Sequence, residues 1–274
     1  MNKKLIAAAI FGLGLAASGS ASAIVVGGVD FGVAGLTNHI ETTTLAETFI
    51  NAPGQTLTGY GQVTTVNGSG SYAGTDLLYF KFTYNVLTFS GTAATFDNGI
   101  VQVYLDPIFN LHAQSSVTNL DLIDNGTLWA TFDGHAMNGG LAELDATGFL
   151  TGNTLSFGGA GLVDVVAGGL PSVQAYLDSN GIGDGAGGFA DIALTTSGNN
   201  AVLNSHDSHT GCATGQAAAG TWCLAGSADL RGLTSVPEPG SLALVALGLI
   251  SLGAIARRGR SKGRSLKKEQ LALG

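Results

Sequence analysis

Residues 77–89 constrain the fold more than any other part of the chain, because apolar and polar side chains alternate along them. The apolar set at every second position is Leu78, Phe80, Phe82, Tyr84 and Val86. Alternate residues of a β-strand point to opposite faces, so this spacing buries one face in a core and leaves the other in water. The stretch therefore predicts one long, half-buried strand.

Shorter runs with strand character follow at regular spacing, separated by turn signals rich in Asn and Gly. They are residues 57–66, 100–105, 127–132, 154–157, 162–166, 191–196 and 227–233. Asp97-Asn98-Gly99 has the composition of a tight hairpin turn, and only residues 172–178, after Pro171, favour a helix. This pattern predicts an all-β domain, either a sandwich or a jelly roll. Whether residues 24–235 form one β domain or two stays open.

The N-terminal 23 residues have the three parts of a secretory signal peptide. Lys3 and Lys4 supply the positive charge, residues 5–17 form the apolar segment, and Ala21-Ser22-Ala23 is a small-residue cleavage site. We expect a signal helix over residues 1–23 that signal peptidase removes, so that the mature chain begins at Ile24 and is exported.

The C-terminal stretch 236–264 also has three parts. It begins with Val236-Pro237-Glu238-Pro239, and prolines mark the start of a helix because they cannot lie inside one. Residues 241–256 carry no charge and predict a transmembrane helix, since lipid tolerates backbone only where it is fully hydrogen-bonded. Arg257 and Arg258 open a basic cluster, which belongs on the cytoplasmic side. We therefore expect residues 24–235 outside the membrane and 265–274 as a basic cytoplasmic tail.

This ordered triple resembles the PEP-CTERM sorting signal of Gram-negative bacteria. The matching residues are Val236, Pro237, Glu238, Pro239, Arg257 and Arg258. The resemblance implies processing by an exosortase-like protease. The protein would be held transiently in the inner membrane and then reach the cell surface or extracellular matrix. An ordinary membrane anchor with a proline-rich neck is the alternative.

A second resemblance concerns the start of the mature chain. Residues 30–68, with Gly54-Gln55-Thr56-Leu57-Thr58-Gly59-Tyr60-Gly61-Gln62-Val63 within them, look similar to the N-terminal part of flocculation-associated PEP-CTERM proteins. That similarity implies a role with exopolysaccharide, in flocculation or biofilm cohesion.

The charge of the predicted ectodomain is strongly negative. Residues 24–235 hold seventeen acidic residues against two basic ones, Lys81 and Arg231, which gives a formal charge of −15. Such a surface repels phosphate backbones, so the composition excludes nucleic-acid binding. It attracts divalent cations or basic partners, and Ca²⁺ could bridge it to anionic exopolysaccharide. The alternative is that the charge only keeps an exported domain soluble.

Two cysteines, Cys212 and Cys223, are the only ones in the chain. An even pair in an exported protein predicts a disulfide, because the compartment is oxidising. Their spacing matches neither a C-x-x-C redox motif nor a zinc pattern.

Two segments contain residue types that bind metals. Residues 178–184 have a faint likeness to a calcium loop, with Asp178, Asn180 and Asp184 as candidate ligands. Ile182 stands where an oxygen ligand belongs, so an acidic turn or a looser Ca²⁺ site are both open. His206 and His209 have a spacing that zinc sites use, but their polar neighbours favour a loop.

No sequence motif indicates catalysis. Residues 24–235 contain no G-x-S-x-G elbow, so we expect a non-enzymatic surface protein without a cofactor. Two alternatives remain. A carbohydrate-binding module would expose Trp129, Tyr72 and Tyr104 on one sheet face, and a glycan-processing hydrolase would need two carboxylates about 5–10 Å apart in a cleft.

Overall fold

A computed structural model describes residues 23–33, 37–207, 211–214 and 216–233. The predicted signal helix, up to residue 22, and the C-terminal sorting segment lie outside the described residues. Within these ranges no helix combines the length and the apolar character that crossing a bilayer requires. The predicted span at 241–256 is not among them.

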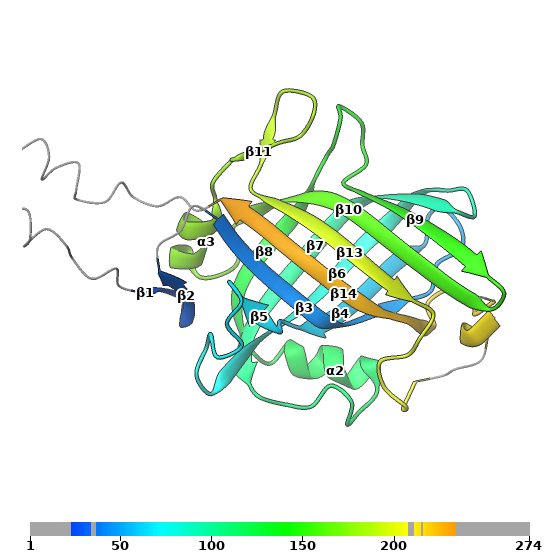
Figure 1. Cartoon of the computed structure of the whole chain (residues 1–274), viewed down its shortest axis with the longest axis horizontal. Coiled ribbons are helices and arrows are strands. Elements are labelled where there is room, and N and C mark those ends of the chain that lie inside the picture. The colour runs from blue at the N-terminus through cyan, green and yellow to red at the C-terminus, as the bar shows by residue number, and fades with distance from the viewer. Residues whose placement is uncertain (1–22, 34–36, 208–210, 215, 234–274) are drawn as a thin grey trace, which may run out of the picture. The chain divides into compact units, whose positions relative to one another are not determined.

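The described residues form mainly strands (Figure 1). In chain order, the strands are β1 (Ala23–Val26), β2 (Val29–Val33), β3 (Thr37–Thr48), β4 (Thr56–Gln62), β5 (Thr65–Val66), β6 (Asp76–Phe89), β7 (Ala93–Pro107), β8 (Thr127–His135), β9 (Leu144–Thr151), β10 (Thr154–Val166), β11 (Ile182–Gly183), β12 (Phe189–Ala190), β13 (Ile192–Asn199) and β14 (Trp222–Leu233). The helices are α2 (Ser116–Ile123), α3 (Pro171–Leu177) and the 3-10 turn η1 (Cys212–Thr214). The prediction of an all-β domain is confirmed, as is a short helix after Pro171.

The main sheet closes on itself. Its strands β3, β4, β6, β7, β8, β10, β13 and β14 pair antiparallel in chain order, and β14 pairs back with β3. The predicted sandwich or jelly roll is therefore wrong, because a sandwich has two stacked sheets and a jelly roll has Greek-key connections. A strand with one buried face shows the same alternation of apolar and polar residues in a closed sheet, a sandwich and a jelly roll, so the alternation alone does not distinguish them.

Strands β8 and β9 share one position in this closed sheet. Both lie between β7 and β10, and both are much shorter than these neighbours. β8 pairs with residues 162–166 of β10, whereas β9 pairs with residues 154–161. The two short strands therefore complete the wall end to end, and the runs 154–157 and 162–166 belong to one strand.

The alternating side chains of β6 point into the closed sheet, as predicted. Leu78, Phe80, Phe82, Tyr84 and Val86 all belong to the main apolar core. Glycines make room for the rings: a Cβ on Gly59 would overlap Phe82, and one on Gly61 would overlap Phe80. Both glycines lie in β4, directly opposite those rings in the β4–β6 register.

The predicted hairpin turn at residues 97–99 is wrong. These residues form a bulge inside β7, where the register passes from Thr83–Ile100 to Asn85–Asp97. Asn98 has a φ of 49°, and a Cβ on Gly99 would overlap the Tyr84 ring. Turn-forming residues also suit bulges, since both need unusual φ angles. The β6–β7 turn lies instead at residues 90–92.

One end of the closed sheet is filled by the hairpin β1–β2 and by α3 (Figure 1). Val29 and Phe31 of β2 pack in the same core as Trp129 of β8 and Val173 of α3. Helix α2 packs elsewhere, on the outer face, over a second apolar cluster that includes Tyr60. The interior is therefore sealed at this end.

The predicted disulfide between Cys212 and Cys223 is confirmed, with 5.1 Å between the Cα atoms. It joins the η1 turn to β14 across a sequence separation of 11 residues. A crosslink that closes so short a loop contributes about 3 kcal/mol by restricting the unfolded chain.

Candidate functional site

The end of the closed sheet opposite α3 contains a cavity of about 270 Å³. Its walls are mainly apolar. They come from the ends of β3 and β6, the starts of β7 and β10, most of the length of β9 and single residues of β4, β13 and β14. The apolar side chains that line it include Phe49, Ile50, Leu57, Phe89, Phe96, Leu144, Leu150, Leu155, Phe157 and Leu224. An inner cavity of about 70 Å³ continues into the core, and both cavities are bordered by Glu47, Leu144 and Thr196.

Glu47 brings a carboxyl group into this apolar interior. In β3 it alternates with its neighbours so that Leu45 and Glu47 share the inner face, and its partner in β4 is Gly59. Only 4% of the residue is exposed. Among the described residues, no hydrogen bond or ion pair reaches its carboxyl oxygens.

The surroundings of Glu47 change its acidity. Burial raises the pKa of the Glu47 carboxyl from 4.5 to about 7, because a charged group loses hydration in an apolar site. A carboxyl group in this state can act as a hydrogen-bond donor when neutral or as a counter-ion when charged. It is the one buried carboxyl on the cavity walls of the described residues.

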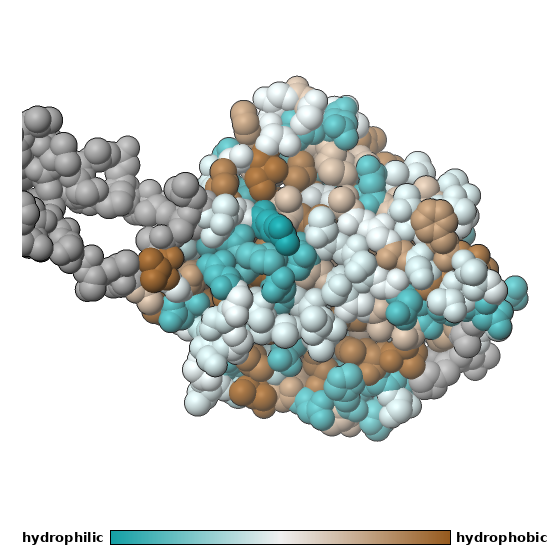
Figure 2. Space-filling model, in the orientation of Figure 1, coloured by the Kyte–Doolittle hydropathy of each residue, from teal (hydrophilic) through white to brown (hydrophobic). Residues whose placement is uncertain are grey.

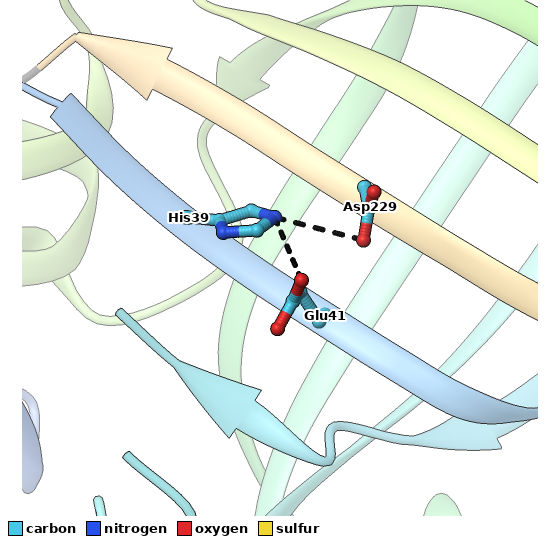
Figure 3. A group of neighbouring side chains, drawn as sticks. All are labelled: His39, Glu41 and Asp229. Carbon is cyan, nitrogen blue, oxygen red and sulfur yellow. Dashed lines mark ion pairs between the residues drawn. The ribbon is translucent and has the colours of Figure 1, made fainter. Parts of the chain in front are cut away.

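A separate group of three side chains lies on the outer surface (Figure 3). His39 Nε2 is 3.2 Å from Glu41 Oε1 and 3.6 Å from Asp229 Oδ1. His39 and Glu41 are two residues apart in β3, and Asp229 faces Glu41 across the β3–β14 pair. Figure 2 shows a hydrophilic surface over this part of β3 and β14.

These three side chains could hold a divalent metal, since one ligand atom from each lies within 4.8 Å of the others. Imidazole with carboxylates suits a transition metal better than Ca²⁺. Both acids also have other partners: Glu41 Oε2 accepts a hydrogen bond from Thr65, and Arg231 lies 3.7 Å from Asp229. The group is thus also explained as a surface network of ion pairs.

A second histidine lies between two acids. His135 Nδ1 is 2.6 Å from Asp164 Oδ2, and its Nε2 is 3.6 Å from Asp184 Oδ2. Burial alone would lower the pKa of His135, but the two carboxylates outweigh it and raise the pKa above 6.5. The pKa of Asp184 is lowered, first by the Ala186 amide and then by other partners including His135.

The predicted calcium ligands are divided between two local arrangements. Asn180 Nδ2 donates to Asp178 Oδ1 at 2.8 Å, whereas Asp184 Oδ1 accepts from the amides of Ala186 and Gly188. Asp184 therefore stabilises its own turn and faces His135. A Ca²⁺ site at these residues stays a prediction. His206 lies in an exposed loop, and His209 is outside the described residues.

The aromatic residues proposed to stack on sugars are core residues. Trp129, Tyr72 and Tyr104 are 0%, 1% and 6% exposed. Tyr72 donates a hydrogen bond to the Val63 carbonyl, and Trp129 Nε1 donates to that of Gly27. These three side chains cannot form the exposed platform that a carbohydrate-binding module needs.

Comparison with known families identifies the C-terminal segment. Residues 235–261 match the PEP-CTERM protein-sorting motif. The chain carries a PEP-CTERM sorting motif. The predicted resemblance is thus confirmed, and the motif includes Pro237-Glu238-Pro239, Arg257 and Arg258, all outside the described residues. No curated protein and no solved structure matches the chain.

The PEP-CTERM motif assigns the protein a destination. It marks an exported protein that an exosortase-like protease sorts to the cell surface of a Gram-negative bacterium. The motif covers only the C-terminal segment, so the role of the closed sheet has to come from its own geometry. The likeness to the flocculation-associated sub-family stays a prediction.

Glu47 is the site residue that our sequence reasoning missed. The segment Leu45-Ala46-Glu47-Thr48-Phe49 places it at a core position, with Leu45 and Phe49 two residues away on either side. An acid on the apolar side of an alternating strand was therefore the available signal.

Proposed function

We propose that this exported protein is a non-enzymatic binding protein that holds one small, largely apolar molecule inside its closed sheet. The observation that carries the proposal is the cavity of about 270 Å³ at one end. Protein interiors normally contain few voids larger than a water molecule. Closed sheets of eight strands are just wide enough to be filled by side chains or to hold one small ligand.

The walls of the cavity favour binding over catalysis. They are apolar apart from backbone groups, threonines, Asn51 and Glu47 at its inner end, and no histidine or cysteine of the described part of the chain borders the cavity. A glycan-processing hydrolase needs two facing carboxyl groups. Glu41 borders the inner cavity, but its carboxylate interacts with His39 and Thr65 on the outer face. Within the described ranges, Glu47 therefore has no second carboxyl group beside it.

Binding of a neutral apolar dye tests this function. The processed protein, recovered from the surface of producing cells, is expected to bind N-phenyl-1-naphthylamine saturably and to increase its fluorescence. Ala94 lines the cavity and Ala113 is exposed. Ala94→Phe should fill the space and weaken binding at least about tenfold, equivalent to about 1.4 kcal/mol, whereas Ala113→Phe should bind normally. No binding by the unmodified protein, or normal binding by Ala94→Phe, contradicts the proposal.

A second function is favoured by the charge of −15 over residues 24–235. We propose that, after a transient stay in the inner membrane, the protein joins the cell surface or the extracellular matrix. There Ca²⁺ would bridge its acidic surface to anionic exopolysaccharide and support flocculation or biofilm cohesion.

Chelation tests that second function. Cells that display the protein are expected to clump in Ca²⁺ and to disperse when EGTA is added, while cells lacking its gene stay dispersed in both conditions. Clumping that depends on the gene but is indifferent to EGTA would rule out Ca²⁺ bridging.

A further inference from the structure

We propose that Glu47 recognises a positively charged amino group, so that the ligand of the closed sheet is an apolar molecule carrying one primary amine. This inference rests on the proposed binding function and names the chemistry of its ligand. Three observations carry it: the isolation of Glu47, the lack of a second charged group inside the cavity among the described residues, and the charge of the domain.

Glu47 is a buried acid that lacks a partner. Its side chain borders both the outer and the inner cavity, and the described residues make no hydrogen bond or ion pair with its carboxyl oxygens. Burying a carboxyl group without a partner is unfavourable, and burying it charged is more so. Most buried acids are paired for this reason. A ligand that brings an ammonium group to Glu47 would remove this cost.

The walls around Glu47 determine whether the ligand carries a positive or a negative charge. Among the residues that the structure describes, no Lys, Arg or His borders either cavity. Besides Glu47, two titratable residues border the inner cavity. The Tyr84 hydroxyl stays neutral because burial raises its pKa, and the Glu41 carboxylate interacts with His39 and Thr65 on the outer face. A carboxylate ligand would therefore meet a like charge and find no counter-ion. An ammonium group would pair with Glu47 directly.

The charge of the rest of the domain also favours a positively charged ligand. With seventeen acidic residues against two basic ones, it attracts cations toward its surface before they bind. An alcohol would gain neither this long-range attraction nor the charge pairing at Glu47. We therefore commit to an amine over an alcohol or an acid.

The cavity also limits the size and orientation of the ligand. Its volume of about 270 Å³ has room for one small ligand, which is what a closed sheet of eight strands can hold. Glu47 lies where the outer cavity meets the inner one, and Phe89 and Leu150 line the outer cavity. The amine would thus enter first, and the apolar tail would lie against the rings and aliphatic side chains of the outer cavity.

Three compounds with the same alkyl chain test the inference in the processed protein at about pH 8. Decylamine, decanol and decanoic acid compete with bound N-phenyl-1-naphthylamine below their micelle concentrations. We expect decylamine to displace the dye at a concentration at least about tenfold lower than decanol, and decanoic acid to be the weakest. In Glu47→Gln this preference should disappear. Asp121→Asn, which removes the same charge from an exposed position, should keep it.

The outcomes separate this inference from the binding function. Failure of the unmodified protein to bind the dye removes the binding function itself. Dye binding with equal displacement by decylamine and decanol leaves that function intact and overturns the role of Glu47. An amine preference that persists in Glu47→Gln also overturns it, because general attraction by the acidic surface would then be sufficient.

A spectroscopic measurement covers the case in which Glu47→Gln does not fold. Decylamine should convert the neutral Glu47 carboxyl to carboxylate at about pH 6, so the infrared band of a protonated carboxyl group should decrease in the unmodified protein. Decanol should leave the band in place. An unchanged band on decylamine binding overturns the inference.

Discussion

Glu47→Gln is expected to stabilise the protein by about 3 kcal/mol at pH 8 and to leave its stability unchanged at pH 4. Burial raises the pKa of the Glu47 carboxyl from 4.5 to about 7, and each unit of pKa difference corresponds to about 1.4 kcal/mol. Glutamine has nearly the same shape as a protonated glutamate but cannot ionise. For a domain of this size the gain corresponds to a rise in Tm of roughly 6–12 °C at pH 8.

The sign follows from proton binding. Between pH 4.5 and 7 the folded protein keeps the Glu47 proton, whereas the unfolded chain releases it. The folded state binds more protons in this range, so the free energy of unfolding falls as the pH rises. The contribution of this proton to the free energy of unfolding is fully present below pH 4.5 and is lost as the pH increases through about 7. Because glutamine does not ionise, the Glu47→Gln variant does not lose this stability as the pH rises.

Denaturant unfolding at several pH values measures the effect. Asp121→Asn serves as the control, because it removes one negative charge from an exposed site and should change stability by less than about 0.5 kcal/mol at every pH. A Glu47→Gln effect of equal size at pH 4 and pH 8 would show that altered packing, and not ionisation, is responsible.

The strand β6 could be predicted in full from the sequence, whereas the closure of the sheet could not. The alternation of residues 77–89 is local, and it determines which side chains share a face. Closure depends on β14 (Trp222–Leu233) pairing with β3 (Thr37–Thr48), which lie at opposite ends of the domain. The Thr-rich β3 has no clear apolar alternation near Thr42, Thr43 and Thr44, where the register also shifts.

Some features of the candidate site could likewise be predicted from the sequence, and others could not. The core position of Glu47 follows from Leu45 and Phe49 beside it, and the disulfide follows from the two cysteines and export. The cavity could not be predicted, because a pattern shows which face is buried but not whether the buried space is filled. The contact between His39 and Asp229 likewise depends on the long-range β3–β14 register.

The cavity is useful as a binding site only if the other end of the sheet stays sealed, and Trp129 is the centre of that seal. Its side chain is fully buried, stacks with Phe31 at 6.3 Å between ring centroids, and donates a hydrogen bond to the Gly27 carbonyl. Gly27 has a φ of 57°, and a Cβ there would crowd Trp129, Val173 and Leu170. Trp129 therefore holds the β1–β2 turn against β8 and α3.

Trp129→Ala is expected to lower the free energy of unfolding by about 4 kcal/mol, because it removes a fully buried ring and leaves a cavity. Trp129→Phe keeps an aromatic ring and should lose only about 1–2 kcal/mol, including the hydrogen bond to Gly27. Thermal unfolding should show a decrease in Tm of roughly 8–16 °C for the alanine variant. Equal losses for Ala and Phe would mean that the hydrogen bond, not the packing, holds the end closed.

Limited proteolysis gives a second measurement of the same variant. Trp129→Ala should free the β1–β2 hairpin, so thermolysin should remove residues 24–33 of the processed protein under conditions in which the rest of the domain resists cleavage. Trp222→Ala is the matched control, because Trp222 packs edge-on against Tyr60 on the outer face, in the cluster beneath α2. It should destabilise the domain without exposing the hairpin. If the hairpin is cleaved equally fast in both variants, its release reflects general loss of stability, and Trp129 has no special part in sealing the cavity.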